Sequence, residues 1–363
     1  MTKNQLLQKR ARRKRQEKLI KLSIPVAAVL VLFLLINAIA HRPHIGKKIR
    51  QQEPVVAEEM VSTDTVQQVA AGEGMTGSVG WNVNDLGWWY LTDENTMYAN
   101  GWKTIEGQRY YFKENGYMAT GWVNTGTVKD SFFDNSGILD TTKQQKLVTL
   151  TYDDGPSANT DGVLDALEKY GMKATFFVVG QQADYYTSQL QREYDLGMEI
   201  GNHSYDHPWL NSLSQDEIIE QLDHNDRILE NRIGIRTKLM RPTGGGISAN
   251  MLEVIDKPMI QWDVDTLDWE HKSADTTYER TMRLVQDGSI VLMHDLFSPA
   301  ADSADRMISS LINEGYKIVT VSELAEAYGY DLQPAYQYLA FYPEGTDLNI
   351  TKEQALEDAR NKE

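Results

Sequence analysis

Cysteine is absent from the 363 residues of this chain. No disulfide framework can therefore form, and any zinc site has to use histidine and carboxylate ligands rather than thiolates. Positive charge is also scarce beyond the N-terminus. The first 21 residues carry nine basic side chains and one glutamate, a net charge of +8. The whole chain has a net charge of −16, so residues 22–363 have a net charge of −24. The strong negative charge of residues 22–363 argues against a nucleic-acid-binding surface, which would need clustered positive charge.

Charged side chains are missing altogether from residues 22–40. As a helix this segment would span roughly 28 Å, close to the ~30 Å hydrocarbon core of a bilayer. The basic residues precede it, so the pattern predicts a cytoplasmic segment 1–21, a transmembrane anchor 22–40 and an extracellular body in the cell membrane. The alternative is a cleaved signal peptide and a secreted protein, because Ala38-Ile39-Ala40 fits a small-residue cleavage site.

Aromatic residues are concentrated after a mixed polar segment. Residues 41–79 show no helical or strand periodicity and are interpreted as a spacer. Five of the eight tryptophans then fall within residues 80–140, where a Gly-Trp pair recurs at intervals of 21 and 20 residues. Such a short unit cannot bury its own aromatic face, so we expect an all-β region of stacked hairpins.

These repeats resemble the cell-wall-binding, choline-binding type repeats of Gram-positive surface proteins. Aromatic side chains of neighbouring repeats form a cage for a quaternary ammonium in that family. The resemblance implies one cage from Trp81, Trp88 and Trp102, and a choline-bearing wall polymer as a partner. Arg109 replaces an aromatic residue of the second unit, and its charge should repel a cation there. The other interpretation is that these aromatics only hold the hairpins together.

Residues 141–330 alternate between short apolar runs and helical patterns. This alternation predicts an α/β domain with parallel strands, which we expect to form a distorted (β/α) barrel of about seven strands. Residues 331–363 are interpreted as an acidic C-terminal tail. The predicted strands are 147–152, 174–179, 199–202, 237–240, 259–264, 289–293 and 317–321, and the predicted helices include 162–170, 216–231, 276–286 and 302–313.

Acids and histidines follow the apolar runs. Asp153 and Asp154 follow the first run, His203 and His207 the third, and His294 the sixth. Because the ends of parallel strands meet on one face of a barrel, these residues should converge. Two adjacent carboxylates, two histidines four apart and a further histidine can bind a divalent metal and still leave a base and an acid. The sequence therefore indicates a metal-assisted hydrolase.

Five short segments strengthen this interpretation when they are taken together. Their order along the chain resembles that of the five motifs of the polysaccharide deacetylases with a NodB homology domain, carbohydrate esterase family 4. The resemblance covers roughly residues 146–326. The segments are 151–156 (TYDDGP), 203–208 (HSYDHP), 241–245 (RPTGG), 265–269 (DTLDW) and 292–294 (LMH).

The resemblance assigns a metal site and its base. It implies that Asp154, His203 and His207 hold a divalent metal, which we expect to be zinc, with cobalt or manganese as alternatives. It further implies that Asp153 is the general base and that Arg241 orients it. A guanidinium beside Asp153 would keep that carboxylate ionised.

The remaining roles concern the acid and the substrate groove. The resemblance implies that His294 is the general acid and that Asp268 is its carboxylate partner. Trp269 would wall the groove, Leu292 would line an acetate pocket, and the backbone N–H at Gly244 would serve the oxyanion. The third motif departs from the family pattern, which usually has a second proline and an aromatic residue where this chain has Thr243 and Gly244.

The expected activity is metal-dependent N-deacetylation of an amino-sugar polymer. Cell-wall peptidoglycan, at its GlcNAc or MurNAc residues, is the expected substrate, because the anchor and the repeats would place the enzyme beside it. The alternatives are an O-acetyl esterase acting on xylan or another glycan, and a catalytically inactive wall-binding protein.

Overall fold

The computed structural model describes residues 63–343, 345 and 347–360. The predicted cytoplasmic segment 1–21 and anchor 22–40 lie outside the described residues. Among the helices that are described, none is long and apolar enough to cross a bilayer.

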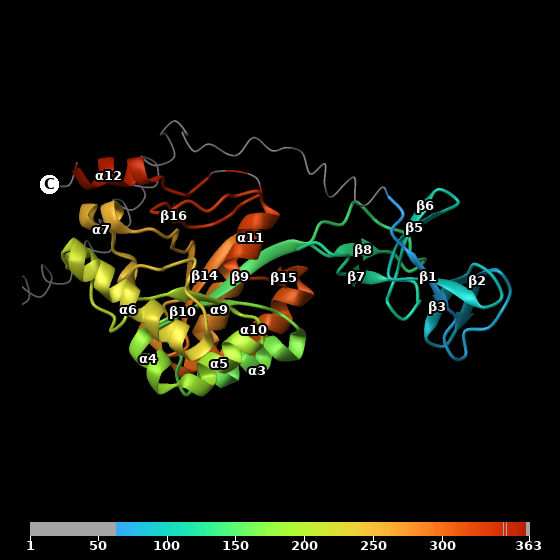
Figure 1. The fold of residues 1–363 in the computed structure, drawn as a ribbon, viewed down its shortest axis with the longest axis horizontal. Helices are drawn as coiled ribbons and strands as arrows, with labels where there is room; N and C mark the ends of the chain where they lie inside the picture. The colour runs from blue at the N-terminus through green and yellow to red at the C-terminus, as the bar shows by residue number, and fades with distance from the viewer. Residues whose placement is uncertain (1–62, 344, 346, 361–363) are drawn as a thin grey trace, which may run out of the picture. The chain divides into compact units, whose positions relative to one another are not determined.

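The repeat region consists of short antiparallel hairpins, as predicted (Figure 1). Its first sheet has the strand order β1-β4-β3-β2, and two separate hairpins, β5–β6 and β7–β8, follow. The bounds are β1 (Gln67–Ala70), β2 (Gly80–Asn84), β3 (Gly87–Leu91), β4 (Thr96–Ala99), β5 (Gly101–Ile105), β6 (Gln108–Phe112), β7 (Gly121–Val123) and β8 (Ser131–Phe133). The predicted spacer 41–79 is wrong at its end, because β1 pairs with β4 and belongs to the first sheet.

The second part of the described chain is an α/β domain built on six parallel strands. Their order is β11-β10-β9-β14-β13, with β15 beside the first half of β9. Every residue of β10 is buried, and so are seven of the eight residues of β9, as expected for strands covered on both faces. The bounds are β9 (Lys146–Asp153), β10 (Thr175–Val178), β11 (Glu199–Asn202), β13 (Val264–Asp265), β14 (Ser289–His294) and β15 (Tyr316–Ile318).

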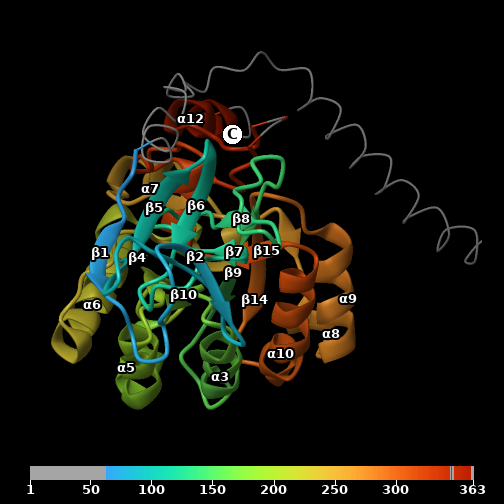
Figure 2. The ribbon, with the colours of Figure 1, turned by 90° about the vertical axis from the view of Figure 1, so that its right-hand side faces the viewer.

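Helices surround these strands, as Figure 2 shows. Helix α10 packs against α3 and α9, and α6 packs against α4 and α7. The helices are α3 (Thr160–Tyr170), α4 (Gly180–Tyr185), α5 (Thr187–Asp195), α6 (Gln215–Ile233), α7 (Ala249–Val254), α8 (Asp268–His271), α9 (Ala274–Leu284), α10 (Ser298–Asn313), α11 (Val321–Ala327) and α12 (Lys352–Arg360).

The parallel α/β prediction is confirmed, but the structure does not show the closed barrel. The predicted strand 237–240 contributes a single bridge residue, Met240, between Asn202 and Met259. The predicted strand 259–264 is divided into two short strands, β12 (Met259–Ile260) and β13. Of these two, β13 lies beside β14, whereas β12 does not belong to the six-stranded sheet. The division has a local cause: the carboxylate of Asp263 accepts hydrogen bonds from the hydroxyl of Ser289 and the backbone of Ile290, so a side chain replaces part of the ladder.

The predicted acidic tail 331–363 is also wrong for its described residues. Strand β16 (Gln337–Tyr338) pairs in parallel with β12. Tyr338 and Phe341 are buried in one cluster with Phe177 and Ile260. Helix α12 packs against α7, so the α/β domain extends to residue 360 (Figure 1).

Candidate active site

The carboxyl ends of the parallel strands bring the predicted residues together. β9 ends at Asp153 and β14 ends at His294, and these two residues are direct neighbours in the register of the strands. β11 ends one residue before His203, and β13 ends three residues before Asp268. The sheet therefore collects at one edge side chains that lie up to 141 positions apart in the sequence.

Asp154, His203 and His207 form a cluster with the geometry of a metal site. One ligand atom from each residue lies within 4.8 Å of the others. The Nε2 atoms of His203 and His207 lie 3.5 Å and 3.1 Å from the same oxygen, Oδ1 of Asp154. This oxygen is buried without a properly oriented hydrogen-bond donor. A buried carboxylate oxygen left in this state is costly, and a cation would satisfy it.

The charge of this cluster suits a divalent cation. Burial alone would raise the pKa of Asp154, but the two histidines reverse the effect and hold its pKa well below its usual range. Two imidazole nitrogens and one carboxylate oxygen are ligands that zinc and neighbouring transition metals accept. The residues present therefore fit a metal, although the set does not choose between zinc, cobalt and manganese.

The tautomer of His203 follows from its neighbour. Its Nδ1 lies 2.8 Å from the carbonyl oxygen of Arg241. Because a carbonyl can only accept, Nδ1 carries a proton, and Nε2 is the nitrogen that faces the carboxylates of Asp153 and Asp154. Nε2 is therefore the atom that His203 would offer to a metal.

The loop that carries the two histidines is fastened to α6. The side-chain amide of Asn225 donates to the carbonyl oxygens of Val178, at 2.7 Å, and Ser204, at 2.9 Å. The side-chain oxygen of Gln221 accepts from the backbone N–H groups of Tyr205, at 3.0 Å, and Asp206, at 3.2 Å. Sequence reasoning missed both residues.

Asn225 left a signal in the sequence. It occupies the apolar stripe of α6, seven residues after Ile218 and four before Leu229, and all three side chains are fully buried. A buried amide needs hydrogen-bond partners, and the backbone of a loop is their usual source. The loop needs such support because Ser204 and His207 both have positive φ angles, 66° and 60°.

Arg241 and Asp153 form a buried ion pair beside the cluster. Nη1 of Arg241 lies 2.7 Å from Oδ1 of Asp153 and donates also to the hydroxyl of Thr151. Its other donors bind the carbonyl oxygens of Ile260 and Gln261. Burial lowers the pKa of Arg241, and the charge of Asp153 opposes that effect. Oδ2 of Asp153 is left facing the site, 3.7 Å from Nε2 of His203.

His294 and Asp268 form a second pair. Oδ1 of Asp268 lies 2.8 Å from Nδ1 of His294, while Oδ2 accepts from the backbone N–H of the same residue. Burial alone would lower the pKa of His294, but the hydrogen bond and charge of Asp268 raise it to about 9. The ring is therefore protonated at neutral pH, with Nε2 available as a proton donor.

The three predicted groove residues have different environments. Leu292 is buried and paired with Thr151 in the sheet, and Trp269 is half-exposed directly after Asp268. Gly244 has a φ of 60° in the short helix η2 (Thr243–Gly245). The roles of these three residues toward a substrate stay predictions.

The predicted cage of Trp81, Trp88 and Trp102 is not what the structure shows. Trp102 is only 4% exposed and packs with Phe133 in a cluster of its own. The guanidinium of Arg109 lies 5.2 Å from the centre of the Trp102 ring and pairs with Asp64. The chain's own cation therefore covers the ring, and Trp88 is half-exposed elsewhere, on β3.

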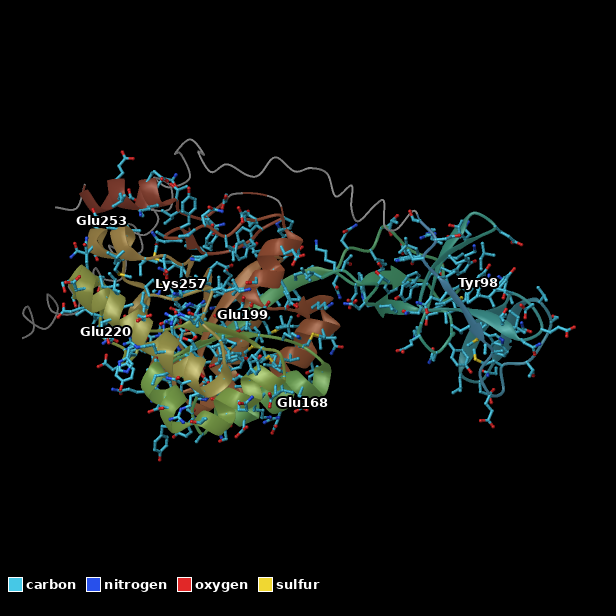
Figure 3. All side chains as sticks on the ribbon, viewed as in Figure 1. Tyr98, Glu168, Glu199, Glu220, Glu253 and Lys257 are labelled. Carbon is cyan, nitrogen blue, oxygen red and sulfur yellow. The ribbon has the colours of Figure 1, made fainter. Side chains whose placement is uncertain are left out.

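Trp81 belongs instead to a group of tyrosines. It contacts Tyr90 edge to face at 5.2 Å, because the register of β2 and β3 pairs these residues, and Tyr110 at 4.9 Å. Tyr98, labelled in Figure 3, stacks on Tyr90. All four rings are partly exposed, so these residues form an aromatic group that is accessible to solvent.

Comparison with protein families matches both parts of the chain. Residues 140–260 match the polysaccharide deacetylase family, and residues 99–141 match the choline-binding repeat. The chain is similar to the peptidoglycan-N-acetylmuramic acid deacetylase PdaC of Bacillus subtilis, with 42% identity over 183 residues, which is 50% of this chain and 39% of that protein. It is also similar to the peptidoglycan-N-acetylglucosamine deacetylase PgdA of Listeria monocytogenes, with 39% identity over 211 residues, 58% of this chain and 44% of that protein. The chain thus spans less than half the length of these curated relatives.

Solved structures show the same α/β fold. The T48 deacetylase with substrate superposes with a TM-score of 0.52 and 36% identity, over 53% of this chain and 96% of that one. A family 4 acetyl xylan esterase from Clostridium thermocellum, in complex with a cobalt ion, superposes with a TM-score of 0.52 and 32% identity, over 54% of this chain and 98% of that one.

Proposed function

Because this chain belongs to the polysaccharide deacetylase family, we propose that it is a metal-dependent hydrolase that removes N-acetyl groups from peptidoglycan. One observation carries the proposal. The cluster of Asp154, His203 and His207 is flanked by a buried carboxylate, Asp153, and by a protonated histidine, His294. Hydrolysis of an amide needs these components: a site of electrophilic activation, a base and an acid.

The base acts through one oxygen. A metal held by Asp154, His203 and His207 would polarise the acetamide carbonyl and acidify a water molecule. Arg241 occupies Oδ1 of Asp153, so Oδ2 is the atom that accepts the proton of the water as it attacks. The ion pair also fixes that carboxylate, which keeps Oδ2 aimed at the site.

The acid acts on the leaving group. An amine leaves poorly unless it is protonated, and Nε2 of His294 holds a proton at neutral pH. Its transfer to the amide nitrogen accompanies cleavage of the C–N bond, giving acetate and a free amino sugar. Asp268 binds Nδ1 and so keeps Nε2 directed at the substrate.

Peptidoglycan is the favoured polymer for two reasons. The relatives in Bacillus subtilis and Listeria monocytogenes are named as peptidoglycan deacetylases, of MurNAc and GlcNAc residues respectively. The repeat region matches a family of choline-binding repeats, which supports a location beside the wall and a choline-bearing wall polymer as a partner. The acetyl xylan esterase among the structural neighbours favours the second candidate function, O-deacetylation of xylan.

The test compares substrates directly. We expect the purified full chain, loaded with zinc, cobalt or manganese, to release acetate from peptidoglycan, and mass spectrometry of the muropeptides should show which sugar has lost its acetyl group. The Asp153→Asn variant is the matched control. Acetate release from acetylated xylan alone would establish the second candidate, and release from neither polymer would indicate a catalytically inactive wall-binding protein.

We also propose that residues 22–40 anchor the protein in the cell membrane with its α/β domain outside. The native protein should then fractionate with membranes and retain its N-terminus. A mature protein that starts at His41 in the medium would instead establish a secreted form.

A further inference from the structure

The side chain of Trp209 is exposed to solvent, whereas its backbone carbonyl takes part in a turn. It precedes the short helix η1 (Leu210–Ser212), and 62% of its surface is accessible. Its carbonyl oxygen accepts from the backbone N–H of Ser212 at 2.9 Å and from the hydroxyl of the same residue at 2.7 Å. Any amino acid supplies this carbonyl, so the turn does not explain a large apolar ring in water.

The indole of Trp209 is nevertheless held in place. A Cβ atom built on Gly244 would lie 2.4 Å from Cζ3 and 2.8 Å from Cη2 of the ring. The six-membered part of the indole therefore rests directly on the Cα atom of Gly244. The φ of 60° at Gly244 disfavours a side chain there as well. The ring is supported on one side and open to solvent on the other.

Thr243 ties the two loops together on both sides of Trp209. Its hydroxyl donates to the carbonyl oxygen of Pro208 and accepts from the backbone N–H of Leu210, at 3.2 Å. Thr243 lies two residues after Arg241, whose side chain binds Asp153 and whose carbonyl binds His203. The indole is thus fixed relative to the reacting groups before any substrate binds.

A fixed, exposed indole suits a carbohydrate. The faces of a pyranose ring carry C–H groups with partial positive charge, and the face of an aromatic ring is negative, so the two pack favourably. A preorganised ring loses little conformational freedom on binding. Trp209 lies two residues after His207, and Trp269 lies directly after Asp268, so the two exposed tryptophans are attached to opposite halves of the site.

We propose that Trp209 is a specificity-determining residue that binds one sugar ring of the glycan chain, next to the sugar that is deacetylated. The proposal rests on the proposed function and deepens it: the enzyme recognises a chain of pyranose rings, with Trp209 as the platform on the side of His207. Thr243 and Gly244, the departures in the third motif, are the residues that make room for this platform and hold it.

The experiment separates recognition of the chain from the chemistry. The substrates are the β-1,4-linked tetramer of N-acetylglucosamine and a small acetyl ester, p-nitrophenyl acetate, which has no second ring. We expect Trp209→Ala to raise KM for the tetramer about tenfold, with little change in kcat, and to leave the ester reaction within about twofold. Trp209→Phe keeps an aromatic face and should recover most of the loss.

A matched control uses another exposed aromatic residue. Tyr194 is 44% exposed in the last turn of α5, which precedes the start of β11 and so lies at the opposite end of the sheet from the site. Tyr194→Ala should behave like the wild type with both substrates. An unchanged KM for the tetramer in Trp209→Ala would overturn the proposal, and so would an equal loss with both substrates, because the ring would then only support the loop of His207.

Binding of the tetramer, measured by calorimetry on the wild type and on Trp209→Ala, keeps the two proposals distinguishable. Weaker binding to the variant supports the platform even if neither protein releases acetate, in which case the proposed function alone has failed. Equal binding to both proteins overturns the platform whether or not the enzyme is active.

Discussion

Replacement of Asp268 by asparagine should move the alkaline limit of activity to lower pH. Burial alone would lower the pKa of His294, but the hydrogen bond and charge of Asp268, together with the smaller effects of Asp153 and Asp154, raise it to about 9. Compared with an ordinary histidine at about 6.5, this favours the protonated ring by about 3 kcal/mol. A general acid works only while it is protonated, so activity should be present below this pKa and be lost as the pH rises through it.

Asparagine keeps the shape of Asp268 and removes its charge. The pKa of His294 should then fall from about 9 toward the ordinary value of about 6.5 or below it, so that most molecules carry a neutral ring at pH 7. We expect the alkaline limb of kcat to move down by the same amount. Turnover at pH 7 should fall about four- to tenfold, because only a minority of the His294 rings keep the proton at that pH. The assay is acetate release from the N-acetylglucosamine tetramer between pH 5 and pH 10, with metal content measured in both proteins.

Stability gives a second readout that does not depend on turnover. The raised pKa of His294 increases the free energy of unfolding. This contribution is complete below about pH 6.5 and is lost as the pH rises to about 9. Urea unfolding of the metal-free wild type should therefore lose about 3 kcal/mol over that range relative to Asp268→Asn. Identical alkaline limbs in the two proteins would refute the assignment of His294 as the acid held by Asp268.

Three further predictions concern the ligands, the base and the repeats. His207→Ala should lose the metal, because one of three ligands is gone; metal analysis checks this, and full occupancy would contradict the assignment. Asp153→Asn should keep its metal while turnover falls about 10² to 10⁴ times, and equal metal loss in Asp153→Asn and Asp154→Asn would show that the two acids are misassigned. Because Arg109 already covers Trp102, the chain should bind at most one choline, with a Kd on the order of 1 mM; titration of tryptophan fluorescence measures the number of sites, and two or more would refute the argument.

The sequence predicts best where local signals agree. The helix predicted at 216–231 is α6, bounded by a capping box of Ser214 and Glu217 and by Gly234 with a φ of 75°. The site residues could be found for a similar reason: each follows an apolar run, and parallel strands place their ends together. Periodicity and order along the chain were sufficient for both.

The rest depends on contacts that leave no periodic trace. β12, β13 and β16 have two residues each, too few to show alternation, and the carboxylate of Asp263 interrupts the ladder between the first two. Trp209 and Gly244 are 35 positions apart, and only the folded loops bring them together. Arg109 was expected to repel a cation at a second cage, and the spacing of the repeats gave no sign that its guanidinium lies over Trp102 of the first.

Arg241 has a consequence for how this site can change in evolution. Its guanidinium binds Asp153, whereas the carbonyl oxygen that binds His203 would be supplied by any residue at position 241, so the identity of this residue matters for the base. A mutation that removes this cation would leave a buried carboxylate without its partner, at a cost of about 3 to 5 kcal/mol. A descendant that abandons catalysis but keeps the fold would therefore need a compensating change at Asp153. Replacement of both Arg241 and Asp153 in a related sequence would indicate a protein that has lost the catalytic activity.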